Sequence, residues 1–292
     1  MKLSHNNFPY SSIFAWVPAY SLEETVRRLA RIGYDGIEIS AGAPHAWPPY
    51  LTTTRRQEVK NLFEEHKTTL SSMLPAPGGG PGVNPASPSE EERRWTVGYY
   101  KEIAELCAEW GAETLLYIPG WQIFGTTRRQ AWAWSREVLG QIAHHAGELG
   151  ITVVIEPTPE NSNLCESCDD AIELMEDVAM PNVKLMFDTC HVFYRREVPT
   201  DYVYRMGKDL KHVHLSEIDR LPPGSGSGDW VSLIDALGEV EFDGYLTMEI
   251  GFQRGREADG GARLAYQFMK PLVDAWSARS SGAESELIGS SG

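Results

Sequence analysis

The sequence is poor in cysteine, in basic residues and in long apolar stretches, and each shortage argues against a class of protein. Four cysteines in 292 residues (Cys107, Cys165, Cys168 and Cys190) are too few for a disulfide scaffold. Cys165 and Cys168 have the CxxC spacing of a zinc-ligand pair, but the chain has no second pair to complete such a site.

The charge balance is strongly acidic. The chain has 26 Lys and Arg against 41 Asp and Glu, a formal net charge of −15, whereas a nucleic-acid partner calls for a basic face. No stretch approaches the length of a membrane span, and residues 1–7 lack the apolar region of a signal peptide. We therefore expect a cytoplasmic protein with no nucleic-acid or membrane partner.

Short apolar runs alternate with amphipathic stretches that begin at polar caps. Ser21 with Glu24, and Ser89 with Glu92, have the spacing of a capping box and predict helices that end near residues 33 and 111. A third long helix is predicted over residues 127–150, and shorter ones after residues 167, 199 and 229. Strands are predicted over residues 36–39, 114–118, 151–155, 183–187, 212–215 and 245–250, with weaker ones near 2–5 and 69–73.

Eight strands that alternate with helices predict an α/β fold with parallel pairing, and eight such units favour a closed (β/α)₈ TIM barrel. No linker divides the chain, so residues 1–276 are expected to form a single domain. Residues 277–292, rich in Ser, Gly and Ala, are expected to be a disordered tail.

Four potential metal ligands follow the last four predicted strands at regular intervals. Glu156, Asp188, His214 and Glu249 are separated by 32, 26 and 35 residues, each about one strand, one helix and a return. In a barrel of this type such positions meet at the carboxyl end of the strands, where catalytic groups lie. Three carboxylates and one imidazole suit one divalent ion, Mn²⁺ first, with Co²⁺ or Mg²⁺ as alternatives.

The residues around these positions resemble a known superfamily. Glu156-Pro157, residues 187–191 (Phe-Asp-Thr-Cys-His), residues 212–214 (His-Val-His) and Met248-Glu249 resemble the xylose-isomerase-like barrels, and within them the ketose 3-epimerases that act on D-tagatose or D-allulose. Residues 36–46 are similar to the fructoselysine 3-epimerases. The resemblance implies a metal-dependent sugar isomerase or epimerase that forms a homodimer or homotetramer.

The same resemblance implies roles for individual residues. Glu156, Asp188, His214 and Glu249 would hold the metal, and Glu156 and Glu249 would also be the catalytic acid/base pair. His191 and Arg220 match positions that hold sugar oxygens.

Further residues are expected at the wall of the sugar site. His45 falls in the loop after the second strand, Trp16 follows the first strand and Trp121 the fourth. Glu160 lies near the place where the family has a further glutamate for the carbonyl end of the substrate. Asn161 stands at the place that the following Ser162-Asn163 indicates, which puts the identity of the sugar in question.

Two other readings fit the same barrel. A lyase or dehydratase, such as an inosose dehydratase or the barrel subunit of a 3-oxo-C-glycoside deglycosidase, also begins by removing a proton beside a ketone; a deglycosidase would add a small β-rich partner subunit. An apurinic endonuclease shares the fold, but the strong acidity and the lack of a histidine near Asp229 argue against it.

Overall fold

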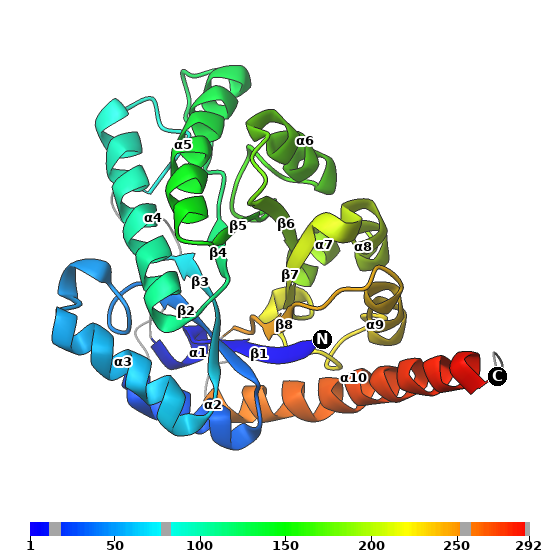
Figure 1. Cartoon of the computed structure of the whole chain (residues 1–292). Coiled ribbons are helices and arrows are strands. Elements are labelled where there is room, and N and C mark those ends of the chain that lie inside the picture. The colour runs from blue at the N-terminus through cyan, green and yellow to red at the C-terminus, as the bar shows by residue number, and fades with distance from the viewer. Residues whose placement is uncertain (12–18, 77–82, 252–257, 290–292) are drawn as a thin grey trace.

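Eight parallel strands close into a barrel in the computed structural model, which describes residues 1–11, 19–76, 83–251 and 258–289, the last ten of these as backbone only. Neighbouring strands pair in chain order, and β8 pairs with β1. The strands are β1 (Lys2–Asn6), β2 (Gly36–Ala41), β3 (Thr69–Pro75), β4 (Thr114–Tyr117), β5 (Thr152–Ile155), β6 (Val183–Asp188), β7 (Leu210–Leu215) and β8 (Tyr245–Met248). The predicted TIM barrel is confirmed, and Figure 1 shows the helices around the strands.

Polar caps start the helices where the sequence predicts them. The hydroxyl of Ser21 accepts a hydrogen bond from the amide of Glu24 at the start of α2, and Ser89 accepts one from the amide of Glu92 at the start of α4. The helices are α1 (Phe8–Ser11), α2 (Leu22–Ile32), α3 (Thr53–His66), α4 (Glu90–Trp110), α5 (Arg128–Glu148), α6 (Cys168–Val178), α7 (Thr189–Tyr194), α8 (Pro199–Met206), α9 (Trp230–Glu239) and α10 (Ala258–Gly289). Short 3₁₀ turns lie at Pro48–Tyr50, Gly207–Asp209 and Ile218–Arg220.

The inside of the barrel is apolar on one side and polar on the other. Strands β3 to β6 contribute Leu74, Leu116, Val154 and Met186, which cluster with Phe8. Strands β7, β8, β1 and β2, together with Ser72 of β3, instead contribute buried polar side chains, namely His212, His214, Thr247, Ser4, Asn6, Glu38, Ser40 and Ser72. The interior of such barrels is usually filled by branched apolar residues. A function is therefore to be sought in the polar half and at the carboxyl ends of the strands beside it.

The C-terminal helix α10 packs against its neighbour α9. A Cβ at Gly238 of α9 would lie 2.1 Å from Nε1 of Trp276, so the glycine makes room for the indole. Arg279 forms an ion pair with Asp235 of α9. Residues 277–289 continue the same helix, and a domain boundary at residue 276 stays a prediction. Within the described residues, no helix has both the length and the apolar character to cross a membrane.

Candidate metal centre

The four predicted ligands meet at the carboxyl end of the strands. Asp188 is the last residue of β6 and His214 lies near the end of β7, while Glu156 and Glu249 directly follow β5 and β8. All four side chains are buried. Each offers one atom to a group in which all ligand atoms lie within 4.8 Å of one another. The regular spacing in the sequence thus corresponds to convergence in space.

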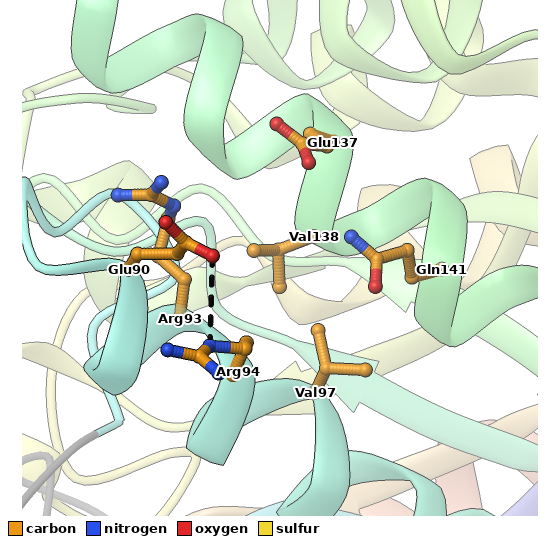
Figure 2. Close-up of a pocket in the computed structure, with 7 residues that line it drawn as sticks. All are labelled: Glu90, Arg93, Arg94, Val97, Glu137, Val138 and Gln141. Carbon is orange, nitrogen blue, oxygen red and sulfur yellow. Dashed lines mark ion pairs between the residues drawn. The ribbon is translucent and has the colours of Figure 1, made fainter.

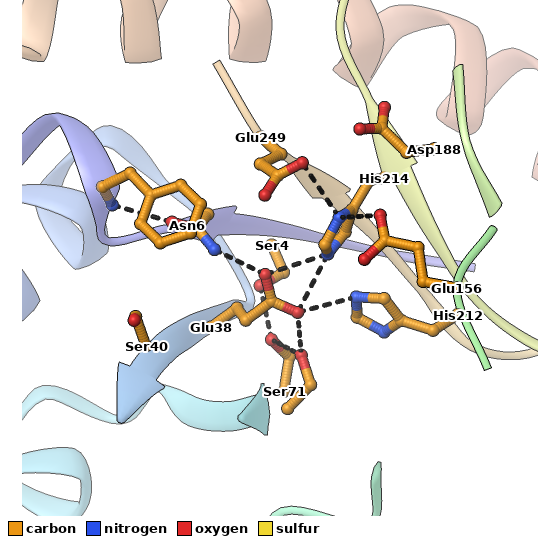
Figure 3. Close-up of polar contacts among 12 residues, drawn as sticks. Ser4, Asn6, Glu38, Ser40, Ser71, Glu156, Asp188, His212, His214 and Glu249 are labelled. Carbon is orange, nitrogen blue, oxygen red and sulfur yellow. Dashed lines mark hydrogen bonds and ion pairs between the residues drawn. The ribbon is translucent and has the colours of Figure 1, made fainter. Parts of the chain in front are cut away.

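His214 lies between the two glutamates of this group. Its Nδ1 is 3.2 Å from Oε2 of Glu249 and 3.6 Å from Oε1 of Glu156 (Figure 3). Three carboxylates that surround one imidazole nitrogen form a hard donor set that fits a divalent cation.

Burial and the neighbouring charges together set the ionisation of these groups. It raises the pKa of Asp188 to about 8 although Arg220 acts in the opposite direction, and it raises the pKa of Glu156. At Glu249 the charges of Arg220 and His214 outweigh burial, and its pKa falls to about 2. Burial also opposes the charge of His214, but Glu38 and Glu249 hold its pKa well above the usual value. The raised pKa values show that the ligand group holds protons that partly balance its buried negative charge. A divalent cation bound there would take over this role.

Arg220 and His191 lie at the edge of the group. The guanidinium of Arg220 contacts the carboxylates of Asp188 and Glu249, and its Nη2 is 3.3 Å from Nε2 of His191. Arg220 has a φ of 58°, uncommon for a residue with a Cβ, and the amide of Gly251 donates to its carbonyl oxygen at 2.8 Å. Burial and Arg220 lower the pKa of His191 to about 3, so this imidazole is neutral.

The other predicted contact residues have different surroundings. His45 is buried. Its Nε2 lies 2.8 Å from the backbone carbonyl oxygen of Tyr20 and its Nδ1 lies 2.8 Å from the side-chain Nδ2 of Asn7, so both ring nitrogens have protein partners. A contact between His45 and a sugar stays a prediction, as it does for Trp121 and Glu160.

Trp121 and Glu160 lie in loops on the same face as the candidate centre, and Trp16 lies outside the described residues. Trp121 is half-buried. The side chain of Asn84 donates a hydrogen bond to the backbone carbonyl oxygen of Trp121 and accepts one from its backbone amide. Glu160 is 44% exposed, with Oε2 3.8 Å from Nδ1 of His191, so it stands at the opening of the centre.

Sequence reasoning missed Glu38 and His212, which join His214 in a second buried group of potential ligands. Nε2 of His212 lies 3.0 Å from Oε2 of Glu38. Burial opposes the charge of Glu38, but His214 and His212 hold its pKa well below the usual range. The available signal was a charged residue between Ile37 and Ile39, because alternation along a buried strand turns Glu38 toward the barrel axis.

Glu217 was also missed, and it organises the loop after β7. Its carboxylate accepts hydrogen bonds from the amides of Gly224 and Gly228, both at 3.2 Å, and from Nε1 of Trp230 at 2.8 Å. The amide of Glu217 donates to the carbonyl of Leu221, across the turn that carries Arg220. The loop is thereby tied to a buried acidic side chain.

A groove lies in the outer helical layer (Figure 2). It is lined from α4 and α5 by Glu90, Arg93, Arg94, Val97, Glu137, Val138 and Gln141. None of the candidate ligands contributes to it, and its two arginines and two glutamates favour neither sign of charge.

The fold and the site define a TIM-barrel protein with a candidate metal centre at the carboxyl ends of its strands. Residues 26–272 match the family described as Xylose isomerase-like TIM barrel, and the chain belongs to this family. Fructoselysine 3-epimerase of Escherichia coli O157:H7 is 26% identical over 258 residues, which cover 86% of this chain and 94% of the relative. D-psicose 3-epimerase of Ruminiclostridium cellulolyticum is 24% identical over 232 residues, 77% of this chain and 76% of the relative.

Solved structures agree on the fold. D-psicose 3-epimerase with D-tagatose from Clostridium cellulolyticum H10 superposes with a TM-score of 0.80 at 22% identity, over 94% of this chain and 99% of that one. Since the relatives are named as epimerases, the chain is an enzyme of the isomerase class.

Replacing Glu217 by alanine should destabilise the protein. Two amides and an indole N–H lose their acceptor, and we expect the free energy of unfolding to fall by about 1–3 kcal/mol. Glu217→Gln, which keeps one carbonyl oxygen as acceptor, should lose less. Chemical denaturation of both variants measures the effect; a Glu217→Ala protein as stable as the wild type would contradict it.

Proposed function

We propose that this protein is a divalent-metal-dependent sugar epimerase that inverts C3 of a ketose or a ketose derivative. The observation that carries the proposal is the convergence of Glu156, Asp188, His214 and Glu249 in one buried group. The names of the relatives, fructoselysine 3-epimerase and D-psicose 3-epimerase, support the substrate class and the carbon. Assembly into a homo-oligomer and a cytoplasmic location stay predictions.

The chemistry requires a way to stabilise negative charge. A proton on the carbon beside a ketone is weakly acidic, because its removal leaves an enediolate. A divalent cation held by the four ligands, Mn²⁺ in our proposal, would stabilise that charge as it develops.

Glu156 and Glu249 would transfer the protons. They follow β5 and β8, which are separated in the barrel by β6 and β7, so they approach the centre from different sides. One carboxylate removes the proton from one face of the carbon and the other returns a proton to the opposite face, which inverts the configuration.

His191 and Arg220 would hold the sugar oxygens. His191 is neutral, and among the described residues its Nδ1 has no hydrogen-bond partner, so this nitrogen is free to bond a hydroxyl group. Arg220 supplies N–H donors beside it. Glu160, and the rings of Trp121 and Trp16, would complete the wall of the site.

Metal binding should be linked to protons. Because the carboxyl group of Asp188 has a pKa of about 8 and His214 also holds a proton, both must deprotonate before they bind a cation. The affinity for Mn²⁺ should therefore rise as the pH increases through about 8, where Asp188 loses its proton. Titration calorimetry of metal-free protein at several pH values, in buffers of different ionisation enthalpy, measures the affinity and the protons released; an affinity that does not change with pH would contradict this prediction.

Chelation should abolish activity, and Mn²⁺ or Co²⁺ should restore it better than Ca²⁺.

The two-glutamate mechanism predicts exchange with solvent. In D₂O, the product should carry deuterium on the carbon that changes configuration, because the returned proton comes from a group that exchanges with water. Glu156→Gln and Glu249→Gln should each lower epimerisation by a factor on the order of 10² to 10⁴. Mass spectrometry and NMR of the product from a ketose panel give both readouts.

A matched control separates lost catalysis from general damage. Glu113 is exposed and precedes β4 at the opposite end of the barrel, so Glu113→Gln should retain full activity. The metal content of each variant has to be measured as well, because Glu156 and Glu249 are also proposed ligands. Product without deuterium would point to hydride transfer, and loss of a leaving group from a 3-oxo sugar would point to a lyase.

A further inference from the structure

The carboxylate of Glu38 lies deep in the polar half of the barrel, fully buried below the candidate metal centre. It is held from the strands on both sides. Nδ2 of Asn6, on β1, donates to Oε1 at 2.6 Å, and the hydroxyl of Ser72, on β3, donates to Oε2 at 2.6 Å. A buried carboxylate needs such donors, and here they fix its position.

The orientation of Asn6 is determined by its other contact. Its Oδ1 accepts a hydrogen bond from the amide of Phe8 at 2.7 Å, so Nδ2 is the atom that faces Glu38. The Asn6 side chain is therefore a donor to Glu38.

His214 connects Glu38 to the metal centre. Nε2 of its ring lies 2.9 Å from Oε1 and 3.0 Å from Oε2 of Glu38, and Nδ1 faces Glu156 and Glu249 (Figure 3). An ionised carboxylate only accepts hydrogen bonds, so Nε2 must carry the proton. In the neutral ring this leaves the lone pair on Nδ1, the nitrogen that faces the other ligands.

We propose that Glu38 is a positioning residue: by accepting a hydrogen bond from Nε2 of His214 it holds the ring and its tautomer so that Nδ1 binds the metal ion. This inference rests on the proposed function, because it assumes a metal at the four-ligand group. Carboxylate partners of this kind orient metal-binding histidines and increase their basicity.

The alternative for these residues is a second metal ion between Glu38, His212 and His214. The hydrogen bonds argue against it. Both oxygens of Glu38 already accept from Asn6 and Ser72, and a second ion would require His214 to lose both ring protons. Nε2 of His212 lies 3.0 Å from Oε2 of Glu38, and the His212 ring meets the His214 ring edge to face, with the centroids 5.1 Å apart.

The test is the affinity for Mn²⁺ of metal-free wild type and of Glu38→Gln. The glutamine has nearly the same shape but no charge, so Nε2 of His214 loses its ionised acceptor and the tautomer that leaves Nδ1 unprotonated is held less strongly. We expect the Kd for Mn²⁺ to rise about 10- to 100-fold while the circular dichroism spectrum is unchanged. Ser40→Ala is the matched control. Ser40 lies on the same face of β2, and its hydroxyl has no hydrogen-bond partner among the described residues, so the Kd should stay at the wild-type value.

The outcomes separate the two claims. If wild type binds Mn²⁺ and Glu38→Gln binds it equally well, the role of Glu38 is wrong and the proposed function stands. If wild type binds no divalent metal, the proposed metal centre itself is wrong, and this inference with it.

A second measurement needs no variant, in case Glu38→Gln does not fold. The measurement is NMR of ¹⁵N-histidine-labelled wild type loaded with Zn²⁺. The imidazole whose ¹⁵N chemical shift moves into the range of metal-bound nitrogen should be bound through Nδ1 and protonated at Nε2. Coordination through Nε2, with the proton on Nδ1, would overturn the proposal.

Discussion

The candidate centre depends on one constraint: buried like charges must be balanced by cations. Glu156, Asp188 and Glu249 are withdrawn from water at the ends of β5, β6 and β8, and each such transfer costs several kcal/mol unless it is compensated. Arg220 and His214 supply part of the compensation through their contacts with these carboxylates. Protons supply another part, as the raised pKa of Asp188 indicates. A divalent cation would complete it.

The same constraint extends into the barrel. Binding through Nδ1 leaves Nε2 of His214 buried, and Nε2 needs an acceptor; Glu38 provides one and in turn needs donors, which Asn6 and Ser72 provide. The polar half of the interior thus forms a chain of hydrogen bonds from β1 and β3 through β2 to β7. The apolar half, around Leu116, packs without such requirements.

The fold and the ligand group could be predicted from the sequence because both depend on regular spacing. Strands, caps and the four ligands recur at intervals that favour a closed barrel of eight strands. Helix α3 was not predicted, since only Val59, Leu62 and Phe63 of its residues are buried and its apolar face is weak. Glu38 was interpreted only as part of a strand, because the role that we propose for it depends on a contact with a residue 176 positions away. The surroundings of His45 could not be predicted either, because its bonds to Tyr20 and Asn7 join residues far apart in the sequence; its contact with a sugar stays a prediction.

The central claim is that one divalent ion binds among the four ligands. Crystals of the protein grown with Mn²⁺, measured at the manganese absorption edge, test it directly. The account predicts one anomalous peak within bonding distance of Glu156, Asp188, His214 and Glu249, with Nδ1 as the nitrogen ligand. The absence of a peak there at saturating Mn²⁺, or a single peak at another group of residues, would contradict it.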